Sequence, residues 1–435
     1  MTLTPDQLKI RSLGERHVRS PLNLSNSPGD GIGDFMPDNA RIVADIAFQG
    51  AEFAATHVAF ERAGPREQIF FDPRQTRAAI VTCGGLCPGL NNVIRSATLE
   101  LLLNYGVRSV LGIRYGYQGL NPEVGEPPIE LTVDRVDDIG ALGGTILGSS
   151  RGEQPAEIML DFLKNQGIQL LICVGGDGTQ RGALALEREA RRRGEAIAVV
   201  GVPKTIDNDI AYVEQTFGFG TALEKAAEHI AGAHAEARGV PYGVGLVKLM
   251  GRHAGFIAVG ATLASGQVNF ALIPEAPFRL DGELGFLARL DKRLRARGHA
   301  VVVVAEGAGQ ELLAELPDEV DASGHRKLGD IGVYLKQRIL EHFRPTELPV
   351  TVKYFDPSYH IRSVPANRAD ALLCNKLARR AVHAGMAGKT GLLIGKQNGY
   401  FTHVPLELVT SGTRRVDTEG EDWTGVLAAT GQGHW

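Results

Sequence analysis

From about residue 78 onward, short apolar runs alternate with amphipathic stretches. Runs such as Ala78–Thr82 and Ile197–Val202 are almost entirely apolar, whereas Thr179–Arg193 mixes apolar and charged residues in a helix-like way. Continuously apolar strands that are separated by helices are typical of parallel sheets covered by helices on both faces. The pattern therefore predicts an α/β fold.

The individual elements follow from the same periodicity. Strands are predicted at Ala78–Thr82, Val107–Ile113, Gln169–Val174, Ile197–Val202, Gly243–Leu249, Asn269–Ile273, Ala300–Ala305 and Val350–Tyr354, and helices at Asn91–Asn104, Thr179–Arg193, Gly220–Ala237, Leu280–Arg297, Gly329–Glu341 and Ala366–Gly385. Eight strands alternating with helices are more than a single open sheet usually contains. We therefore expect two Rossmann-like lobes with parallel-rich sheets and an active site in the cleft between them. The expected organisation is an N-terminal extension over 1–75, lobes over 76–215 and 216–385, and a C-terminal segment over 386–435.

Composition and charge exclude several classes of function. The 435 residues carry 46 Lys plus Arg against 50 Asp plus Glu, a net charge of −4, so no basic field favours a nucleic-acid partner. No apolar run is long enough to suggest a membrane span, and the polar N-terminus suggests a cytoplasmic protein. Four scattered cysteines indicate buried thiols rather than disulfides or a metal site. The 54 glycines exceed the roughly 30 of average composition, and glycine-rich loops commonly approach phosphates.

Two loops are rich in glycine, and the first of them follows a predicted strand. Thr82–Asn92 contains Gly84 and Gly85 directly before a helix, and Gly143–Gly152 ends in Arg151 and Gly152. Glycines admit a phosphate to the backbone and an arginine can neutralise it, although a tight turn explains either loop equally well.

The next two loops add carboxylates. Asp177 lies between glycines in Gly175–Thr179, where it could bind a phosphate through Mg²⁺, while Thr179 also suits a helix N-cap. In Gly201–Asp209, Asp207 could take a proton from a sugar hydroxyl while Thr205 or Lys204 stabilises the transferred group, although the segment also suits a simple turn.

Three later groups carry further polar side chains. Arg252, in Met250–Gly255, fits a phosphoryl clamp, and its neighbour His253 is interpreted as a packed histidine at a helix start. Glu275 could accept hydrogen bonds from sugar hydroxyls. A second phosphate could be held by Lys353, Tyr359 and Arg362.

Taken in order, these motifs resemble the 6-phosphofructokinase family. They read TCGGLCPGLNN, GGTILGSSRG, GGDGTQRGA, PKTIDNDI, KLMGRHAGF, IPEAPF and YHIR, within a resemblance that spans about residues 78–396. It implies a two-lobed enzyme that transfers a phosphoryl group to O1 of fructose 6-phosphate. The first lobe would bind the nucleotide with Mg²⁺ and the second the sugar phosphate. The resemblance also implies a homo-oligomer, either a homotetramer or a dimer.

The resemblance assigns roles residue by residue. Asp207 corresponds to the catalytic base, assisted by Thr205, Lys204, Arg252 and Arg151, and Asp177 to the Mg²⁺ ligand. Nucleotide-binding positions are matched by Gly85, Tyr117, Arg151, Gly152, Gly176, Asp177, Gly178 and Thr179. Sugar-phosphate positions are matched by Thr205, Ile206, Asp207, Met250, Gly251, Arg252, Glu275, Lys353, Tyr359, His360, Ile361 and Arg362.

Several positions depart from the short bacterial members of that family. Lys353 and Tyr359 stand where those enzymes carry an arginine and a histidine, and Leu99 replaces an effector-site arginine. Effector control of the short bacterial kind is therefore not expected. The pattern is more similar to the longer subunits that group near pyrophosphate-using members.

The identity of the phosphoryl donor depends on two positions. Pyrophosphate-using relatives usually carry an aspartate at the Gly178 position and a lysine at the Lys204 position, whereas this chain combines Gly178 with Lys204. A side chain at 178 would fill the space that the α-phosphate of ATP needs, so ATP is the expected donor and pyrophosphate the alternative. Two other interpretations are a non-catalytic regulatory subunit, which should have lost its base or metal residue, and a NAD or lipid kinase, which would lack the PKTIDND and MGR motifs.

Overall fold

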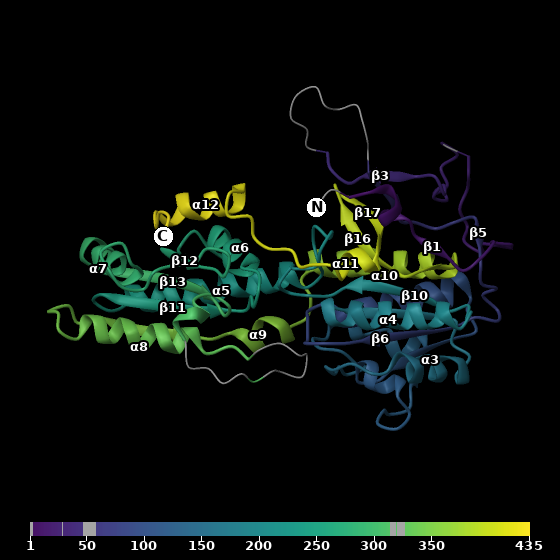
Figure 1. Ribbon diagram of the computed structural model, residues 1–435, viewed down its shortest axis with the longest axis horizontal. Coiled ribbons are helices and arrows are strands. Elements are labelled where there is room, and N and C mark those ends of the chain that lie inside the picture. Colours follow the sequence, from purple (N-terminus) through teal and green to yellow (C-terminus); the bar gives the residue numbers. More distant parts are fainter. Residues whose placement is uncertain (1–2, 28, 47–57, 314–318, 320–326) are drawn as a thin grey trace. The chain divides into compact units, whose positions relative to one another are not determined.

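The computed structural model describes residues 3–27, 29–46, 58–313, 319 and 327–435 (Figure 1). The chain forms two compact units. The first comprises residues 1–205, 210–218 and 364–413, and the second comprises 206–209, 219–363 and 414–435. The chain thus passes between the units at different places from the expected boundaries at 215 and 385.

A nine-stranded sheet forms the centre of the first unit, in the order β3-β4-β17-β16-β10-β9-β6-β7-β8. Its central strands, β16 to β7 in that order, are parallel, and the edge strands are antiparallel. All residues of β9 and β10 are buried, as their apolar sequences require. The bounds are β3 Arg41–Val43, β4 Ala59–Arg62, β6 Arg77–Thr82, β7 Ser109–Ile113, β8 Ile129–Glu130, β9 Leu170–Gly175, β10 Ala198–Pro203, β16 Leu392–Gln397 and β17 Tyr400–Pro405.

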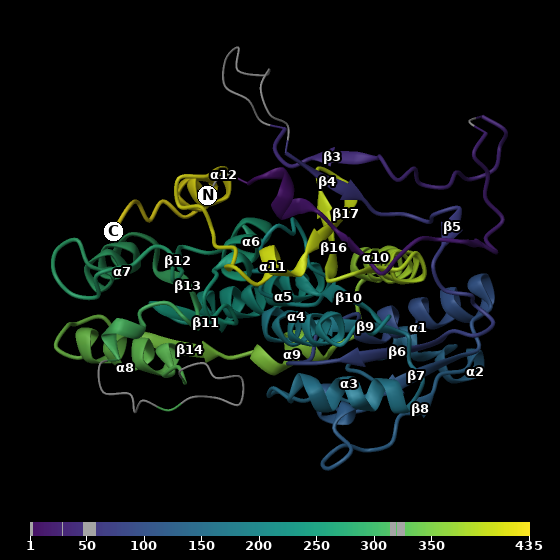
Figure 2. The ribbon, with the colours of Figure 1, turned by 45° about the vertical axis from the view of Figure 1, so that its right-hand side comes forward.

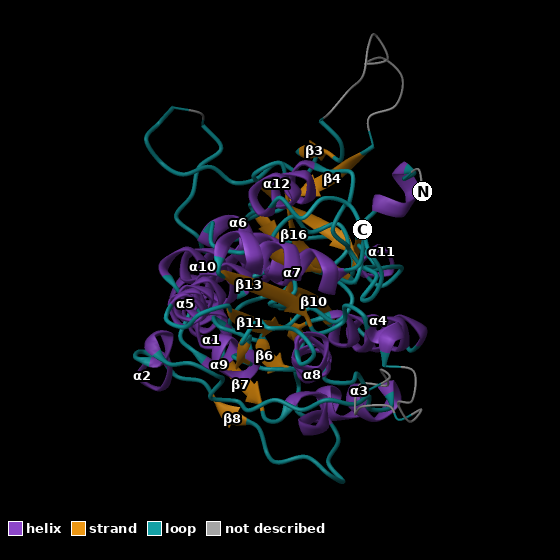
Figure 3. Ribbon diagram, turned by 90° about the vertical axis from the view of Figure 1, so that its left-hand side faces the viewer, coloured by secondary structure: helices purple, strands orange, loops and turns teal. Residues whose placement is uncertain are grey.

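Helices cover both faces of this sheet (Figure 3). Helices α1 and α10 lie on one face, and α3, α4 and α11 lie on the other. Their bounds are α1 Leu90–Leu99, α3 Ala156–Asn165, α4 Asp177–Arg192, α10 Arg368–Met386 and α11 Leu406–Val409. A π-helical segment over Glu100–Tyr105 continues α1, which accounts for the longer helix that the sequence predicts.

The second unit contains a parallel four-stranded sheet in the order β12-β13-β11-β14. Helices α5 and α6 lie on one face, and α7 and α8 pack their apolar sides into the core on the other. The bounds are α5 Phe219–Arg238, β11 Gly243–Leu249, α6 Phe256–Ser265, β12 Phe270–Leu272, α7 Phe286–Arg297, β13 His299–Ala305, α8 Ile331–Phe343, β14 Thr351–Phe355, α9 Ser358–Ser363 and α12 Glu421–Thr430.

All eight predicted strands are present within a few residues, so the predicted α/β class with parallel-rich sheets is confirmed. Helix α7 begins later than predicted because a turn that includes Gly282 at φ +92° precedes it. The described part of the N-terminal extension is not only loop, since β3 and β4 join the main sheet beside β17 (Figure 2). Shorter elements are β1 Arg11–Ser12, β2 Val18–Arg19, β5 Gln68–Ile69, α2 Val133–Val136 and β15 Lys389–Thr390.

Two expectations concern chemistry rather than fold. All four cysteines are free and buried, as expected. Among the described residues, no helix combines the length and the apolar character that crossing a membrane would need.

Candidate active site

In the first unit, the two glycine-rich loops 82–92 and 143–152 are joined by hydrogen bonds beyond the ends of β6 and β7. The Gly84 amide donates to the Ser150 carbonyl at 3.0 Å, and the Ser149 hydroxyl donates to the Gly84 carbonyl at 2.6 Å. Thr82 Oγ1 donates to the carbonyl of Gly148 at 2.9 Å. Residues 82–85 and 148–150 are thus joined by hydrogen bonds into one layer of backbone. Arg151 and Gly152, which follow it in the chain, are exposed.

Lys204 joins this layer to a third loop. Its ammonium group is buried and donates to the Gly85 carbonyl at 2.7 Å, while its amide donates to the Gly175 carbonyl at 3.1 Å. A side chain at Gly84 would approach the ammonium to 3.2 Å, and Gly84 itself has φ +84°. A fixed positive charge thus lies against the glycine-rich backbone, which is a favourable setting for phosphate oxygens.

Asp177 is the first residue of α4, and Gly176 is the N-cap. Thr179 therefore does not cap the helix, contrary to the alternative interpretation of the sequence; it is buried in the first turn, 2.0 Å from where a side chain on Gly175 would stand. The carboxylate of Asp177 pairs with Arg181 on the next turn. This places one partly exposed carboxylate at a positive helix end.

The space around Gly178 is open. A Cβ added there would meet only the Arg181 guanidinium, at an ordinary contact distance of 3.7 Å. The glycine is therefore not required by packing, in contrast to Gly175.

Tyr117 is buried, and its hydroxyl donates to the Thr179 carbonyl at 2.6 Å beneath α4. Gly182 admits its ring, because a Cβ there would stand 2.4 Å from the ring edge. The neighbouring Tyr115 is exposed instead, at φ +53° and beside Gly148. Sequence reasoning missed Tyr115, since nothing in the pattern distinguishes which tyrosine faces outward.

The Lys-Thr-Ile-Asp segment contributes to both units: Lys204 and Thr205 belong to the first, and Ile206 and Asp207 to the second. The Thr205 carbonyl accepts a hydrogen bond from Thr216 Oγ1 at 2.7 Å, and Ile206 is buried. Asp207 is half-buried and precedes Asn208, which has φ +54°. The segment is thus a shaped turn that carries a carboxylate.

In the second unit, the Met250-Gly251-Arg252 loop packs closely on the loop after β13. Gly251 has φ +129° and its carbonyl accepts from the Gly307 amide at 3.1 Å. A side chain on Gly307 would overlap the Arg252 carbonyl at 1.9 Å. His253 is exposed, so its interpretation as a packed histidine is wrong: Gly255, rather than His253, caps α6 and meets the core.

Glu306 is a carboxylate in this loop pair that sequence reasoning missed. Burial raises its pKa, and the charges of Arg252, Lys248 and Arg362 act in the opposite direction. Its only sequence signal is its place directly after the apolar strand β13. The cations near Glu306 come from distant parts of the chain and are brought together by tertiary folding.

Glu275 holds the start of α6. Its carboxylate oxygens accept from the Gly255 amide at 3.0 and 3.1 Å, and Oε1 also accepts from the Val416 amide at 2.9 Å. These bonds tie α6 to the C-terminal segment of the second unit and orient the carboxylate.

The last predicted group lies on β14 and α9. Lys353 pairs with Glu236 of α5 at 3.8 Å. On α9, Ile361 is buried and Tyr359 is 76% exposed, with the Arg362 guanidinium 4.7 Å from the centre of its ring. His360 Nδ1 lies 3.1 Å from His229 Nε2 of α5. Tyr359 and Arg362 thus present one polar edge of α9, while His360 faces α5.

Lys248 links the N-terminal ends of α8 and α9. Its ammonium contacts Asp330, the N-cap of α8, at 3.0 Å and Asp356, just before α9, at 2.9 Å. Burial alone would lower the pKa of Lys248, but these two carboxylates raise it well above its usual range. Sequence reasoning missed this lysine, which lies inside the apolar strand β11.

Three comparisons with known proteins bear on this geometry. The family model described as Phosphofructokinase matches residues 77–385. The chain is 46% identical over 433 residues to "ATP-dependent 6-phosphofructokinase" of Borreliella burgdorferi, with 98% of this chain and 96% of the relative covered. It is 46% identical to the protein of the same name from Amycolatopsis methanolica, with 99% and 96% covered.

Solved structures agree on the fold. A pyrophosphate-dependent phosphofructokinase from Marinobacter aquaeolei matches with a TM-score of 0.67 at 21% identity, covering 83% of this chain and 92% of the other. At this identity the likeness bears on fold alone.

Proposed function

Because the chain belongs to the phosphofructokinase family, we propose that it is an ATP-dependent 6-phosphofructokinase, which transfers the γ-phosphoryl group of ATP to O1 of fructose 6-phosphate. The observation that carries the proposal is 46% sequence identity, over nearly the full length of the chain, to proteins of that name, together with an intact set of motif residues. The enzyme is a phosphotransferase of glycolysis, and its product is fructose 1,6-bisphosphate.

For the donor, we assign the layer around Gly85, Lys204 and Gly176 to the phosphates of ATP. Support comes from the buried Lys204 ammonium against the Gly85 carbonyl and from the glycines that leave the backbone accessible. The open space at Gly178 favours ATP over pyrophosphate, since a nucleotide needs room beyond its terminal phosphates. Arg151, Gly152 and Thr179 complete the set of residues assigned to the nucleotide. The exposed Tyr115 is a better candidate than the buried Tyr117 for contact with the nucleotide base.

We propose that Asp177 is the protein's ligand for Mg²⁺. A carboxylate oxygen suits this ion, and the described residues contain no cluster of three or more acidic, histidine or cysteine side chains that could form an all-protein cage. Mg²⁺ commonly keeps several waters and binds substrate phosphates, so one carboxylate is a fitting contribution. When bound, the ion would neutralise phosphate charge, and Arg181 would have to release Asp177 to it.

For the acceptor, we assign Asp207 as the base that takes the proton of the O1 hydroxyl. Thr205 and Ile206 shape the turn that presents it, and Lys204 lies on the same segment to offset charge on the transferred group. Arg252, on its tightly packed loop with Met250 and Gly251, would hold the phosphoryl group in place, and Arg151 would do so from the donor side.

The sugar phosphate itself is assigned to the polar edge of α9 and its neighbours. Arg362 and Tyr359 with Lys353 would bind the 6-phosphate, and Glu275 the sugar hydroxyls. His360 and Ile361 would act indirectly, since the first faces His229 and the second is buried.

An Asp207→Ser variant tests the assignment and separates it from a regulatory role. We expect turnover to fall by about 10³-fold or more, because the substitution removes the base that takes the O1 proton, while fructose 6-phosphate still binds. Binding is followed by calorimetry and turnover by fructose 1,6-bisphosphate formation. Near wild-type turnover would remove Asp207 from the base role; a wild-type chain that binds the sugar phosphate without turnover would favour a regulatory subunit.

We also propose that the enzyme works in the cytoplasm as a tetramer or dimer, as the family resemblance implies. Light scattering coupled to size-exclusion chromatography measures the assembly directly.

A further inference from the structure

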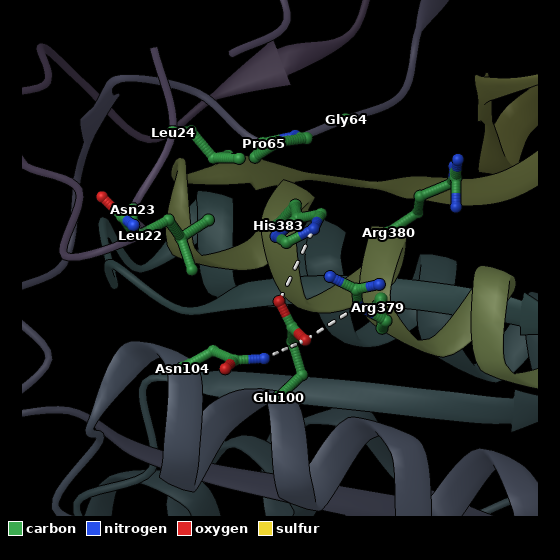
Figure 4. Close-up of a pocket in the computed structure, with 10 residues that line it drawn as sticks. All are labelled: Leu22, Asn23, Leu24, Gly64, Pro65, Glu100, Asn104, Arg379, Arg380 and His383. Carbon is green, nitrogen blue, oxygen red and sulfur yellow. Dashed lines mark hydrogen bonds and ion pairs between the residues drawn. The ribbon is translucent and has the colours of Figure 1, made fainter. Parts of the chain in front are cut away.

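A cavity of about 380 Å³ lies in the first unit, apart from its glycine-rich loops (Figure 4). Its acidic residue, Glu100, is 2% exposed and accepts hydrogen bonds from Asn104 at 2.6 Å and from the Arg379 guanidinium at 2.9 Å. The carboxylate and the arginine thus balance each other within the protein, and this pair needs no ligand.

A pair of ionisable side chains in the second unit is arranged differently, beside the short helix α9. This helix has six residues, too few to be stable in isolation, and its buried residue is Ile361. Just before it, Asp356 contacts the Lys248 ammonium at 2.9 Å. The position of α9 therefore depends on its contacts with the rest of the second unit, and α5 is one of its neighbours (Figure 1).

Two histidines join α9 to α5. His229 Nε2 lies 3.1 Å from His360 Nδ1, and the rings meet edge to face, with their centres 5.2 Å apart and their planes at 82°. At this distance one nitrogen donates a hydrogen bond to the lone pair of the other. The bond can form while at least one ring is neutral. When both rings are protonated, two N–H groups and two positive charges face each other, and the bond is lost.

The surroundings of His229 favour its neutral form. Burial and the charge of His360 lower the pKa of His229, Lys225 acts in the same direction, and Glu228 opposes them. Glu228 is itself paired with Lys225 at 2.7 Å. Because the pKa of His229 is lowered, the contact with α9 is retained above that pKa and is lost as the pH falls through it.

The ionisable side chains of the other elements packed on α5 have contacts of their own. Helix α6 carries no ionisable residue. The others are Lys248 of β11, which contacts Asp330 and Asp356, His299 of β13, whose ring lies 5.3 Å from that of His234, and Lys353 and Tyr354 of β14, which contact Glu236 and Asp330. On α9 itself, the Arg362 guanidinium lies over the Tyr359 ring.

We propose that His229 is a positioning residue for the sugar phosphate: its hydrogen bond to His360 holds α9 where Tyr359 and Arg362 bind the 6-phosphate, and acid releases the helix. His229 does not touch the substrate. It acts through His360, which lies between the two binding residues in the chain. This inference rests on the proposed function, because it takes from it the assignment of α9 to fructose 6-phosphate.

Two variants separate the hydrogen bond from its titration. His229→Leu removes the bond, and we expect KM for fructose 6-phosphate at pH 8 to rise about fivefold with kcat nearly unchanged, as loss of one hydrogen bond predicts. His229→Gln keeps an amide that can donate to His360 but does not titrate. Its KM at pH 8 should therefore match that of the wild type.

The pH profile of KM distinguishes the proposed role from simple packing. Between pH 8 and pH 5.5, KM of the wild type should rise about threefold more than KM of His229→Gln, because only the wild type can carry two protons on the facing nitrogens. Phosphate monoesters also take up a proton near pH 6, but this affects both proteins alike. His234→Gln is the matched control, since His234 lies on the same helix and faces His299; this variant should follow the wild type at every pH.

Hydrogen exchange reports on α9 without turnover. At pH 8, the amides of residues 358–363 should exchange faster in His229→Leu than in the wild type. Equal exchange, equal KM values for these two proteins at pH 8, or the same rise of KM in acid for His229→Gln and the wild type would overturn the inference. A wild type that does not turn over fructose 6-phosphate would instead contradict the proposed function, and the exchange measurement would still test the contact between α5 and α9.

Discussion

Gly178 is the residue at which the choice of donor is most open to test. Its surroundings would accept a side chain without overlap, so a variant there should fold. Gly178→Asp would place a negative charge beside the phosphates that we assign to this layer, and we expect kcat/KM for ATP to fall about 100-fold, equivalent to about 2.7 kcal/mol.

The measurement is steady-state kinetics with ATP and with pyrophosphate. Gly232→Asp is the matched control, because Gly232 lies on the exposed side of α5 with nothing near its Cβ position. Unchanged use of ATP by Gly178→Asp would show that the residue does not set the donor.

The places of single residues were predictable where they belong to a motif, and their roles stay predictions. Asp177 and Arg252 lie two and three residues after the ends of β9 and β11, where open α/β sheets commonly bind their ligands. Glu306, Lys248 and Tyr115 were missed because their environment depends on residues far away in the chain. Which side chain is exposed, or which carboxylate meets which cation, is a property of tertiary packing.

At the scale of elements, Lys248 holds the starts of α8 and α9 together through Asp330 and Asp356. Lys248→Met would leave two neighbouring carboxylates without their cation, so α9 should lose its fixed position. Because α9 carries Tyr359 and Arg362, we expect KM for fructose 6-phosphate to rise about tenfold, with kcat changed much less. Steady-state kinetics at varied concentrations of fructose 6-phosphate measure KM and kcat separately.

Lys292→Met, on the exposed side of α7, serves as the control for removing a lysine. If Lys248→Met lowers kcat and leaves KM unchanged, the lysine does not position the sugar-phosphate residues.

The strands and main helices of the two sheets were predictable because their apolar residues follow the period of the element. The hairpin of β16 and β17 was missed, although Asn398-Gly399 is a strong hairpin signal and both residues have positive φ. The edge strands β3 and β4 are short and partly exposed, so they leave no period in the sequence; β4 is placed by pairing with β17, and β3 by pairing with β4.

That pairing includes a buried charge cluster, which gives a prediction for the whole molecule. Glu61 of β4 accepts from Arg66 at 3.0 Å, from Lys389 at 3.2 Å, and shares a hydrogen bond with His403 at 3.1 Å. Burial alone would raise the pKa of Glu61, but the His403 hydrogen bond and the charges of Lys389 and Arg66 hold that pKa well below its usual range. The carboxylate therefore stabilises the fold above pH about 4.5 and loses this effect progressively as pH falls.

Glu61→Gln should lower the free energy of unfolding at pH 7 by about 3 kcal/mol, since Lys389 and Arg66 would stay buried without their carboxylate. The difference in the free energy of unfolding between the variant and the wild type should be smaller at pH 3, because the stabilisation by the wild-type carboxylate has begun to decrease there. Urea unfolding at both pH values measures it, with the exposed Glu130→Gln as control. A difference that grows as pH falls would show that the Glu61 carboxylate does not stabilise the fold through its charge.

The most direct test of the proposed reaction is an assay of the purified chain with fructose 6-phosphate, Mg²⁺ and either ATP or pyrophosphate. We predict that fructose 1,6-bisphosphate forms with ATP and that pyrophosphate does not replace it. Product with pyrophosphate alone would contradict the role assigned to Gly178, and no product with either donor would contradict the proposed function itself.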